Sequence, residues 1–390
     1  MIHLFFISLV LSDLVFSAFD KLPIVLVGLA GLYTWAFKRK FKLHAFELMY
    51  LIFLMAMVAT TIKVGFTGNT IQYLFLFALQ FGVLSYIIER QQKNDRYIEE
   101  CFDSIVKWNV IISIVGMLDF LLYNVGIISP IRDYFYSFKV DSFYPSPNIY
   151  GVMSAFSLVF TIRKIEMYGL TYTRLAVAII FLISILLSTS SMAFGIPLVY
   201  LVVKRLNYLL MTLGVMVVIF TISYWELYAG YPNIPIDVIL NKRLEIWINA
   251  FQMWSESPYL GIGTGNFQIF NDLQLYGRDI GNNYGLHSLF MWLIIETGII
   301  GTAIFIFFII AVLIRVNRYA VRKSVLAFLS LIFVCQLTEF YLDHEEIFSL
   351  LFWLIIAGAC IRTPYFYTIN KNNIKTINNP PKETLKTVKT

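Results

Sequence analysis

Two ionisable side chains flank a glycine-rich turn in the longest polar stretch of the sequence. Arg243 begins the segment RLEIWINAFQMW, and His287 stands where the next apolar run begins. An arginine is a forked, permanently charged donor that suits phosphate oxygens, and a neutral imidazole can take a proton from an attacking hydroxyl. The pair could therefore hold a phosphate group and activate a nucleophile beside it, although a histidine at such a place is more often a packed or hydrogen-bonded side chain.

The direction of Arg243 follows from the helix that residues 235–257 are predicted to form. The apolar residues of this segment recur at a spacing of three to four and make one stripe: Leu240, Leu244, Trp247, Phe251 and Trp254. At 100° per residue, Arg243 falls within about 40° of Trp247 and Trp254. It therefore projects from the apolar face and needs an anion there. That anion is either a membrane lipid phosphate reached by snorkelling or the pyrophosphate of a lipid-linked ligand.

The turn after Pro258 reads GIGTGN, from Gly261 to Asn266. No strand is predicted before it and no Lys-Ser/Thr pair closes it, so it lacks the signature of a nucleotide-binding loop. We expect it first of all to return the chain to the membrane as a tight turn, and its N–H groups could also form a nest for phosphate. The candidate binding groups within it are Gly263, Gly265 and Asn266.

Two features of the following apolar run bear on His287. Glu296 lies nine positions further on, which places it on the opposite face and about 13 Å along a continuous helix. It cannot orient His287 in that geometry, and we expect it to pair with another helix. Gly298 and Gly301 are expected to form a close-packing helix face.

The composition indicates which kind of fold must hold these residues. Hydrophobic residues make up 59% of the 390 residues and charged residues only 14%, whereas a soluble globular chain carries about 25% charged residues. The basic residues stand in short clusters between apolar runs and form no face that could follow a nucleic acid backbone. The three cysteines have no spacing typical of a disulfide framework or a metal site. The sequence predicts an all-α integral membrane protein that contacts membrane lipid and no nucleic acid.

Apolar runs long enough to cross a membrane, or nearly so, predict about twelve transmembrane helices. They lie at about 2–19, 22–37, 44–62, 70–88, 104–128, 147–162, 174–188, 191–203, 206–223, 286–314, 324–341 and 346–361. The polar run from Ser188 to Ser191 separates two of the shorter pieces, which must therefore be helices joined by a tight turn.

Most of the 30 Lys and Arg residues fall on one side of the membrane if the N-terminus is cytoplasmic. Residues 1–369 then form a single polytopic membrane domain with outward loops at about 129–146 and 224–285, the second of which contains the amphipathic helix. Residues 370–390 form a disordered cytoplasmic tail. Three acidic residues in or near spans are functional candidates by default: Asp13, Glu47 and Asp119. The acidic turn at 343–346 is better explained as solvated than as a metal site, and we expect no metal.

The order of these pieces resembles the bacterial O-antigen polymerase and O-antigen ligase superfamily. In that family a large periplasmic loop carries an arginine, a Pro- and Gly-rich turn, and a histidine followed by Asn or Ser at the head of a late span. The corresponding pieces here are Arg243, Pro258 to Phe267, and His287 with Ser288.

Two upstream pieces also resemble that family. The segment from Lys139 to Asn148 is similar to a loop that ends in Pro-Asn before a span, and Ser188 to Ser191 is similar to a Ser-x-Ser-Arg-Gly turn. Lys139 and Ser191 stand where the family usually has arginine, so bidentate phosphate binding is not expected from either position.

The resemblance implies a glycosyltransferase that needs no cofactor and acts on the periplasmic face of the bacterial inner membrane, with both termini in the cytoplasm. Its donor is an oligosaccharide on undecaprenyl pyrophosphate. By the same resemblance Arg243 binds the pyrophosphate and His287 activates the acceptor hydroxyl. Lys139 or Arg132 assists at the phosphates, and Asn148 is a further candidate for substrate binding.

The acceptor distinguishes the members of this superfamily. A polymerase moves the glycan onto another lipid-linked repeat unit, with a chain-length regulator as its expected partner protein, and a ligase moves it onto lipid A–core. The sparsely charged, aromatic-rich outer loops favour a polymerase. A transporter of lipid-linked oligosaccharides is a third reading, but it is disfavoured because the two halves of the sequence show no repeat.

Overall fold

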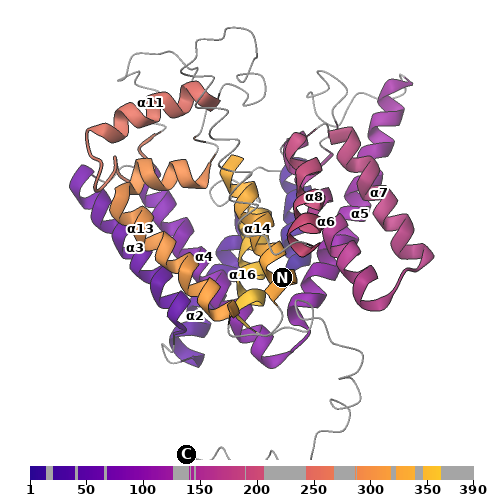
Figure 1. Ribbon diagram of the computed structural model, residues 1–390, viewed down its shortest axis with the longest axis horizontal. Helices are drawn as coiled ribbons and strands as arrows, with labels where there is room; N and C mark the ends of the chain where they lie inside the picture. The colour runs from indigo at the N-terminus through magenta and orange to yellow at the C-terminus, as the bar shows by residue number, and fades with distance from the viewer. Residues whose placement is uncertain are drawn as a thin grey trace, which may run out of the picture.

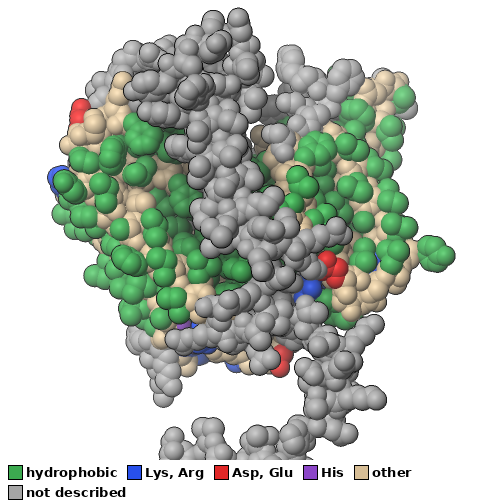
Figure 2. Space-filling model, viewed as in Figure 1, with side chains coloured by type: hydrophobic (Ala, Val, Ile, Leu, Met, Phe, Trp, Pro, Cys, Tyr) green, Lys and Arg blue, Asp and Glu red, His purple; other side chains and the backbone are tan. Residues whose placement is uncertain are grey.

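A computed structural model describes residues 1–14, 21–39, 43–65, 68–125, 140, 142–144, 146–188, 190–205, 243–267, 286, 288–317, 322–338 and 346–361. Every regular element in these residues is helical, and none of them lies in a strand. Within the described residues, four helices are long and apolar enough to cross a membrane, and several shorter apolar helices accompany them. Figure 2 shows the broad hydrophobic surface of this assembly. The predicted all-helical fold is confirmed for the described residues, and the total of twelve spans stays a prediction.

Each predicted span contains a helix, except for 206–223, which lies outside the described residues. The elements are α1 (Ile2–Leu14), α2 (Leu22–Tyr33) continued by the π-helical turn η2 (Thr34–Lys38), α3 (Ala45–Val64), α4 (Gly68–Lys93), α5 (Tyr97–Asn124), α6 (Pro147–Tyr168), α7 (Tyr172–Ser188), α8 (Ser191–Arg205), α11 (Arg243–Ser255), α13 (Leu289–Asn317), α14 (Arg322–Thr338) and α16 (Glu346–Cys360).

The helices form two groups with α14 and α16 between them (Figure 1). In one group α2 packs on α4 and α3 packs on α13, and in the other α6 packs on α7 and α8. The α2–α4 contact is very close, because a Cβ added to Gly31 would lie 1.7 Å from the carbonyl oxygen of Gly82. Aromatic rings fill the junction of α3, α13 and α16, where the Tyr50 ring lies 4.8 Å from Trp353 and 5.7 Å from Phe308 between centroids.

The bundle has two distinct ends. We call the end that carries α11, the α3–α4 turn, residues 140–146 and the α7–α8 turn the loop end (Figure 1). The opposite end, which we call the basic end, carries the α2–α3, α4–α5 and α6–α7 connections and the C-terminal end of α13 (Figure 1). Its described basic residues include Arg39, Arg90, Lys93, Lys164 and Arg315. The described parts of both predicted outward loops therefore share one end. The side of the membrane that this end faces stays a prediction.

The tight turn between α7 and α8 is confirmed. Helix α7 ends at Ser188 and α8 begins at Ser191, and the hydroxyl of Ser188 accepts from the N–H of Ser190 at 3.3 Å. Residue 140 lies against this turn, since the N–H of Val140 donates to the carbonyl oxygen of Leu187 at 3.2 Å. The short loop before α6 is thereby held against the α7–α8 turn at the loop end.

Candidate functional site

The amphipathic helix exists within the described residues as α11. Among its described side chains, Ala250 and Met253 are buried, at 0% and 1% exposure, Trp247 and Trp254 are partly buried, and Phe251 is 42% exposed. The face of α11 that packs against the bundle therefore centres between positions 250 and 253, and the contact of the predicted apolar stripe with lipid stays a prediction. Residue 243 precedes Ala250 by about two turns and shares its direction along the helix. The side chain of Arg243 and residues 235–242 lie outside the described residues.

Helix α13 is interrupted, and this corrects the expectation of a continuous helix. Gly298 has φ 65° and ψ −170°, far from helical values, so α13 consists of a first segment up to Thr297 and a second segment from Ile299. Figure 1 shows the change of direction below α11. A helix break inside a membrane bundle leaves backbone donors and acceptors without their helical partners, and another part of the protein must satisfy them.

Residues 258–267, which we call the glycine turn, satisfy those backbone groups. Four hydrogen bonds with N–O distances of 3.0–3.1 Å join it to the break: Ile262 and Gly263 donate to the carbonyls of Ile295 and Glu296, and Ile299 and Ile300 donate to the carbonyls of Pro258 and Tyr259. The glycine turn is thus built into α13 as a fixed part of the bundle. The tight turn that the sequence predicts here is confirmed.

Two glycines make this contact possible. A Cβ on Gly261 would lie 2.5 Å from the carbonyl carbon of Glu296, and a Cβ on Gly298 would lie 2.4 Å from the carbonyl oxygen of Tyr259. Both glycines also have positive φ, at 70° and 65°, which side chains other than glycine rarely adopt. The sequence predicted that Gly298 packs closely against a neighbouring helix. In the structure its close contact is with the glycine turn.

The carboxylate of Glu296 binds the inside of the glycine turn. It is buried, at 2% exposure, and it accepts from the N–H of Gly265 at 2.6 Å and from the N–H of Phe267 at 3.1 Å. The expectation that Glu296 pairs with another helix missed this contact, because it assumed an uninterrupted α13.

The predicted substrate-binding residues of the turn have partners within the protein. The N–H groups of Gly263 and Gly265 donate to Glu296, and the side-chain amide of buried Asn266 donates to the carbonyl of Ile262 at 3.0 Å. From α4, the hydroxyl of Thr70 donates to the carbonyl of Thr264 at 2.8 Å. A role for these three residues in binding substrate stays a prediction, and their described contacts stabilise the turn.

The backbone on both sides of position 287 is anchored. The carbonyl of buried Leu286 accepts from the indole N–H of Trp247 in α11 at 3.0 Å. Ser288, also buried, caps the start of α13, where its hydroxyl accepts from the N–H of Met291 at 3.4 Å. His287 itself lies outside the described residues, as do Arg132 and Lys139. Their predicted roles are not tested by the geometry.

Of the upstream candidates, Asn148 is described. It is exposed in the first turn of α6, where Ser146 caps the helix by accepting from the N–H of Ile149 at 3.3 Å. The loop before it is fixed by the hydroxyl of Ser142, which donates to the carbonyl of Ile112 at 3.0 Å, and by a hydrogen bond from Tyr144 to the side chain of Asn109. Asn148 is thus presented at the loop end on a fixed helix start.

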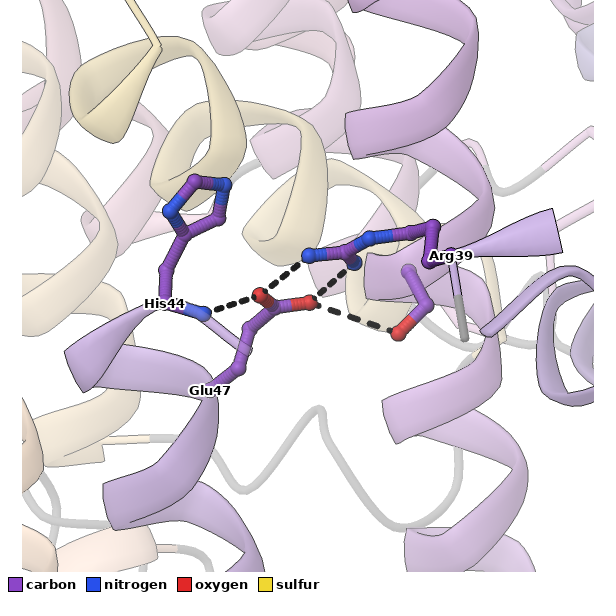
Figure 3. A network of polar contacts seen from close by, with 4 residues as sticks. Arg39, His44 and Glu47 are labelled. Carbon is purple, nitrogen blue, oxygen red and sulfur yellow. Dashed lines mark hydrogen bonds and ion pairs between the residues drawn. The ribbon is translucent and has the colours of Figure 1, made fainter. Parts of the chain in front are cut away.

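Glu47, a candidate from the sequence, belongs to the basic end and has a different environment (Figure 3). Its carboxylate forms a bidentate ion pair with Arg39, with N–O distances of 2.5 and 2.8 Å, and accepts from the N–H of His44 at 2.8 Å. The hydroxyl of Ser85 in α4 lies 3.5 Å from it. This arrangement ties the connection between α2 and α3 to α4, which is a structural role.

Together these features define a helical membrane-type protein whose loop end is organised by a broken helix and the turn built into it. Residues 149–306 match the family model described as O-antigen ligase. The match includes α6, α7, α8, α11, the glycine turn and the break in α13, and over that segment it confirms the resemblance to the O-antigen ligase and polymerase superfamily. Among curated proteins, none matches the chain.

Proposed function

We propose that the protein is a glycosyltransferase that works at the loop end, on the periplasmic face of the bacterial inner membrane. Its donor is an oligosaccharide carried by undecaprenyl pyrophosphate. The observation that carries this proposal is the arrangement around the glycine turn, which fixes α11 and the chain on both sides of position 287 in one unit. The family match covers the same unit.

In this proposal Arg243 and His287 have separate roles. Arg243 binds the pyrophosphate, and Lys139 or Arg132 assists it. His287 takes the proton of the acceptor hydroxyl as its oxygen attacks the anomeric carbon of the donor sugar. A glycosidic bond forms, the bond from the anomeric carbon to the phosphate oxygen breaks, and undecaprenyl pyrophosphate leaves. The pyrophosphate is itself the leaving group, so the transfer needs no nucleotide.

The acceptor that we favour is a second lipid-linked repeat unit, which makes the protein an O-antigen polymerase. The sparsely charged, aromatic-rich outer loops support this choice, as does Ser191 at the position where the family usually has arginine. The second candidate is an O-antigen ligase that uses lipid A–core as the acceptor, and the description of the matching family favours it.

Deletion of the gene followed by gel analysis of the lipopolysaccharide distinguishes the two acceptors. Core that carries a single repeat unit is the outcome expected for a polymerase. Bare core with accumulated lipid-linked polymer contradicts the polymerase proposal and assigns the ligase reaction.

Complementation of the deletion strain tests the two residues. We expect Arg243→Ala and His287→Ala to restore no full-length polysaccharide while reaching the membrane in normal amount. Glu256→Gln, an exposed change just after α11, is the control and is expected to complement fully. Full complementation by both alanine variants contradicts their assignment.

A further inference from the structure

We propose that Glu296 is a positioning residue for this transfer, through the hold that its buried side chain has on the glycine turn. The proposal rests on the proposed function, because it concerns how the same site is held together. In this proposal Glu296 contacts neither the donor substrate nor the acceptor substrate. Its effect on the reaction passes through the backbone of residues 263–267.

The first step is the way the glycine turn closes around this one residue. Three alternate N–H groups of the turn converge on Glu296: that of Gly263 donates to its carbonyl at 3.0 Å, and those of Gly265 and Phe267 donate to its two carboxylate oxygens. Gly263 and Gly265 have positive φ, at 88° and 76°. A loop backbone in such a conformation can turn its N–H groups inward as a concave nest that suits an anion. The anion in this nest is the protein's own carboxylate.

The second step is the location of Glu296 within a closed ring of contacts. Its helix segment begins at Leu289, directly after the cap residue Ser288, and ends at the break. The turn leads back to α11 through Pro258, whose carbonyl accepts from the indole N–H of Trp254 at 3.1 Å. From α11 the indole of Trp247 returns to the carbonyl of Leu286.

This ring passes through α11 from Trp254 to Trp247, about one turn from Arg243, and through both neighbours of position 287. Arg243, which we propose binds the pyrophosphate, and His287, the proposed base, thus belong to two segments that are held at a fixed separation. Glu296 supplies the side-chain link between the turn and the first segment of α13. A misplacement of about 1 Å between reacting groups can cost about 100-fold in rate, so loosening this link is expected to slow the transfer without removing any group that binds substrate.

The third step is the chemistry of the link, which requires two acceptor oxygens. A glutamine at position 296 keeps the length of the side chain but replaces one oxygen with an NH₂ group that cannot accept from an N–H. An aspartate keeps both oxygens but is one methylene shorter. Glu296→Gln therefore tests whether two acceptor oxygens are required, and Glu296→Asp tests whether the length of the side chain is required.

The test uses the purified full-length protein in detergent, with the undecaprenyl pyrophosphate-linked repeat unit as donor and acceptor. For Glu296→Gln we expect kcat to fall by about 10- to 100-fold, with KM for the lipid-linked substrate within about twofold of the wild-type value. The thermal midpoint is expected to stay close to that of the wild type. Glu256→Gln is the matched control at an exposed position and is expected to change neither constant.

The outcomes separate this proposal from the proposed function. If the wild type shows no transfer with this substrate, or with lipid A–core as acceptor, the proposed function fails. If the wild type is active and Glu296→Gln keeps its kcat, or loses activity only in proportion to its folded fraction, the positioning proposal alone is overturned. If Glu296→Gln cannot be isolated folded, Glu296→Asp decides: a kcat reduced about tenfold or more at unchanged KM supports the proposal, and a kcat within about twofold overturns it.

Discussion

Two buried glutamates lie at opposite ends of the bundle and bind very different partners. Glu47, fully buried at the basic end, holds the guanidinium of Arg39 in a bidentate ion pair only eight residues away in the sequence. Glu296 at the loop end accepts from main-chain N–H groups 31 and 29 residues away. Both carboxylates have strong donors, as a buried charge requires.

The difference lies in what each carboxylate fixes. The ion pair of Glu47 joins two side chains, so it secures the short connection between α2 and α3 while the backbone of the helices follows its own hydrogen bonds. The contacts of Glu296 define the path of a loop backbone, and that loop in turn completes a broken helix. The basic end should therefore respond to mutation mainly in stability, and the loop end mainly in rate.

Gly298→Ala is expected to have the largest effect. The added Cβ would lie 2.4 Å from the carbonyl oxygen of Tyr259, and the backbone conformation costs a residue other than glycine about 1–3 kcal/mol. The turn can no longer fit into the break, and we expect polysaccharide formation to fall by about 100-fold or more. Polysaccharide yield per membrane-inserted protein is the measurement.

The matched control for this change is Gly195→Ala in α8. A Cβ at Gly195 meets nothing within 4 Å, and alanine is favoured over glycine inside a helix by about 1 kcal/mol. The control should retain full activity. Equal loss in both variants would show that the effect has nothing to do with the glycine turn.

Glu47→Ala is expected to have the next largest effect, and on stability. It leaves the guanidinium of Arg39, whose side chain is 10% exposed, without its carboxylate, and breaking a buried pair in this way costs about 3–5 kcal/mol. We expect a lower thermal midpoint and a lower yield of folded protein, with a normal transfer rate per folded molecule.

Replacing both partners tests the cause of that loss. In Arg39→Met/Glu47→Leu no buried charge remains, and most of the lost stability should return. A double variant as unstable as Glu47→Ala would show that the contacts of Glu47 to His44 and Ser85 matter more than the ion pair. A fall in the rate per folded molecule would contradict the division of roles between the two ends.

The sequence was sufficient to predict the helical fold and the two helix pieces on either side of Ser188 to Ser191. Both follow from local properties, namely the length of an apolar run and the polarity of the residues that interrupt it. The family resemblance was predicted from the order of short motifs between Lys139 and Ser288, and the match over residues 149–306 confirms it over that segment.

The break at Gly298 could not be predicted from the same patterns. Apart from Glu296 and Thr297, the residues around Gly298 are apolar, so a hydropathy profile predicts one continuous span across it. A glycine in such a run is just as typical of a close-packed helix face. The break is stabilised by residues about 40 positions earlier, such as Pro258 and Tyr259. The contact of Glu296 was missed for that reason. The two overlapping GxG pairs of the turn, together with Glu296 and Gly298 in the next span, were the available signal.

Trp247→Phe is expected to have a smaller effect at the loop end. Phenylalanine keeps most of the partly buried ring but loses the N–H that donates to the carbonyl of Leu286, and a neutral hydrogen bond contributes about 1 kcal/mol. We expect the transfer rate to fall several-fold with little change in the thermal midpoint. Steady-state kinetics on the purified variant provide the measurement.

Trp108→Phe is the matched change in the middle of α5, outside the ring of contacts at the loop end. The indole of Trp108 donates to Nδ1 of His3 in α1 at 2.8 Å. We expect a modest loss of stability and an unchanged rate per folded molecule. A slower rate in Trp108→Phe, or a normal rate in Trp247→Phe, would contradict the proposed ring of contacts at the loop end.

The pH dependence of stability is expected to be the smallest effect, and it should come from the basic end. His44 precedes the candidate span Ala45–Lys63. Burial lowers the pKa of its imidazole below the ordinary value of 6.5; the Glu47 carboxylate opposes this effect, and Arg39 and Arg315 add to it. The unfolded chain then takes up this proton at a higher pH than the folded protein. The contribution of neutral His44 to the stability of the folded protein is therefore present above about pH 6.5. It is lost as the pH falls toward the lower pKa of the folded state.

Thermal midpoints of the wild type and of His44→Gln, measured between pH 7.5 and 5.5 in the same detergent, check this expectation. Glutamine does not titrate, so the variant should lose less stability than the wild type as the pH falls. The main-chain N–H of residue 44, which binds Glu47, is retained in the variant. If the wild type instead gains stability relative to His44→Gln at pH 5.5, then the attraction of Glu47 outweighs burial and the pKa of His44 is raised.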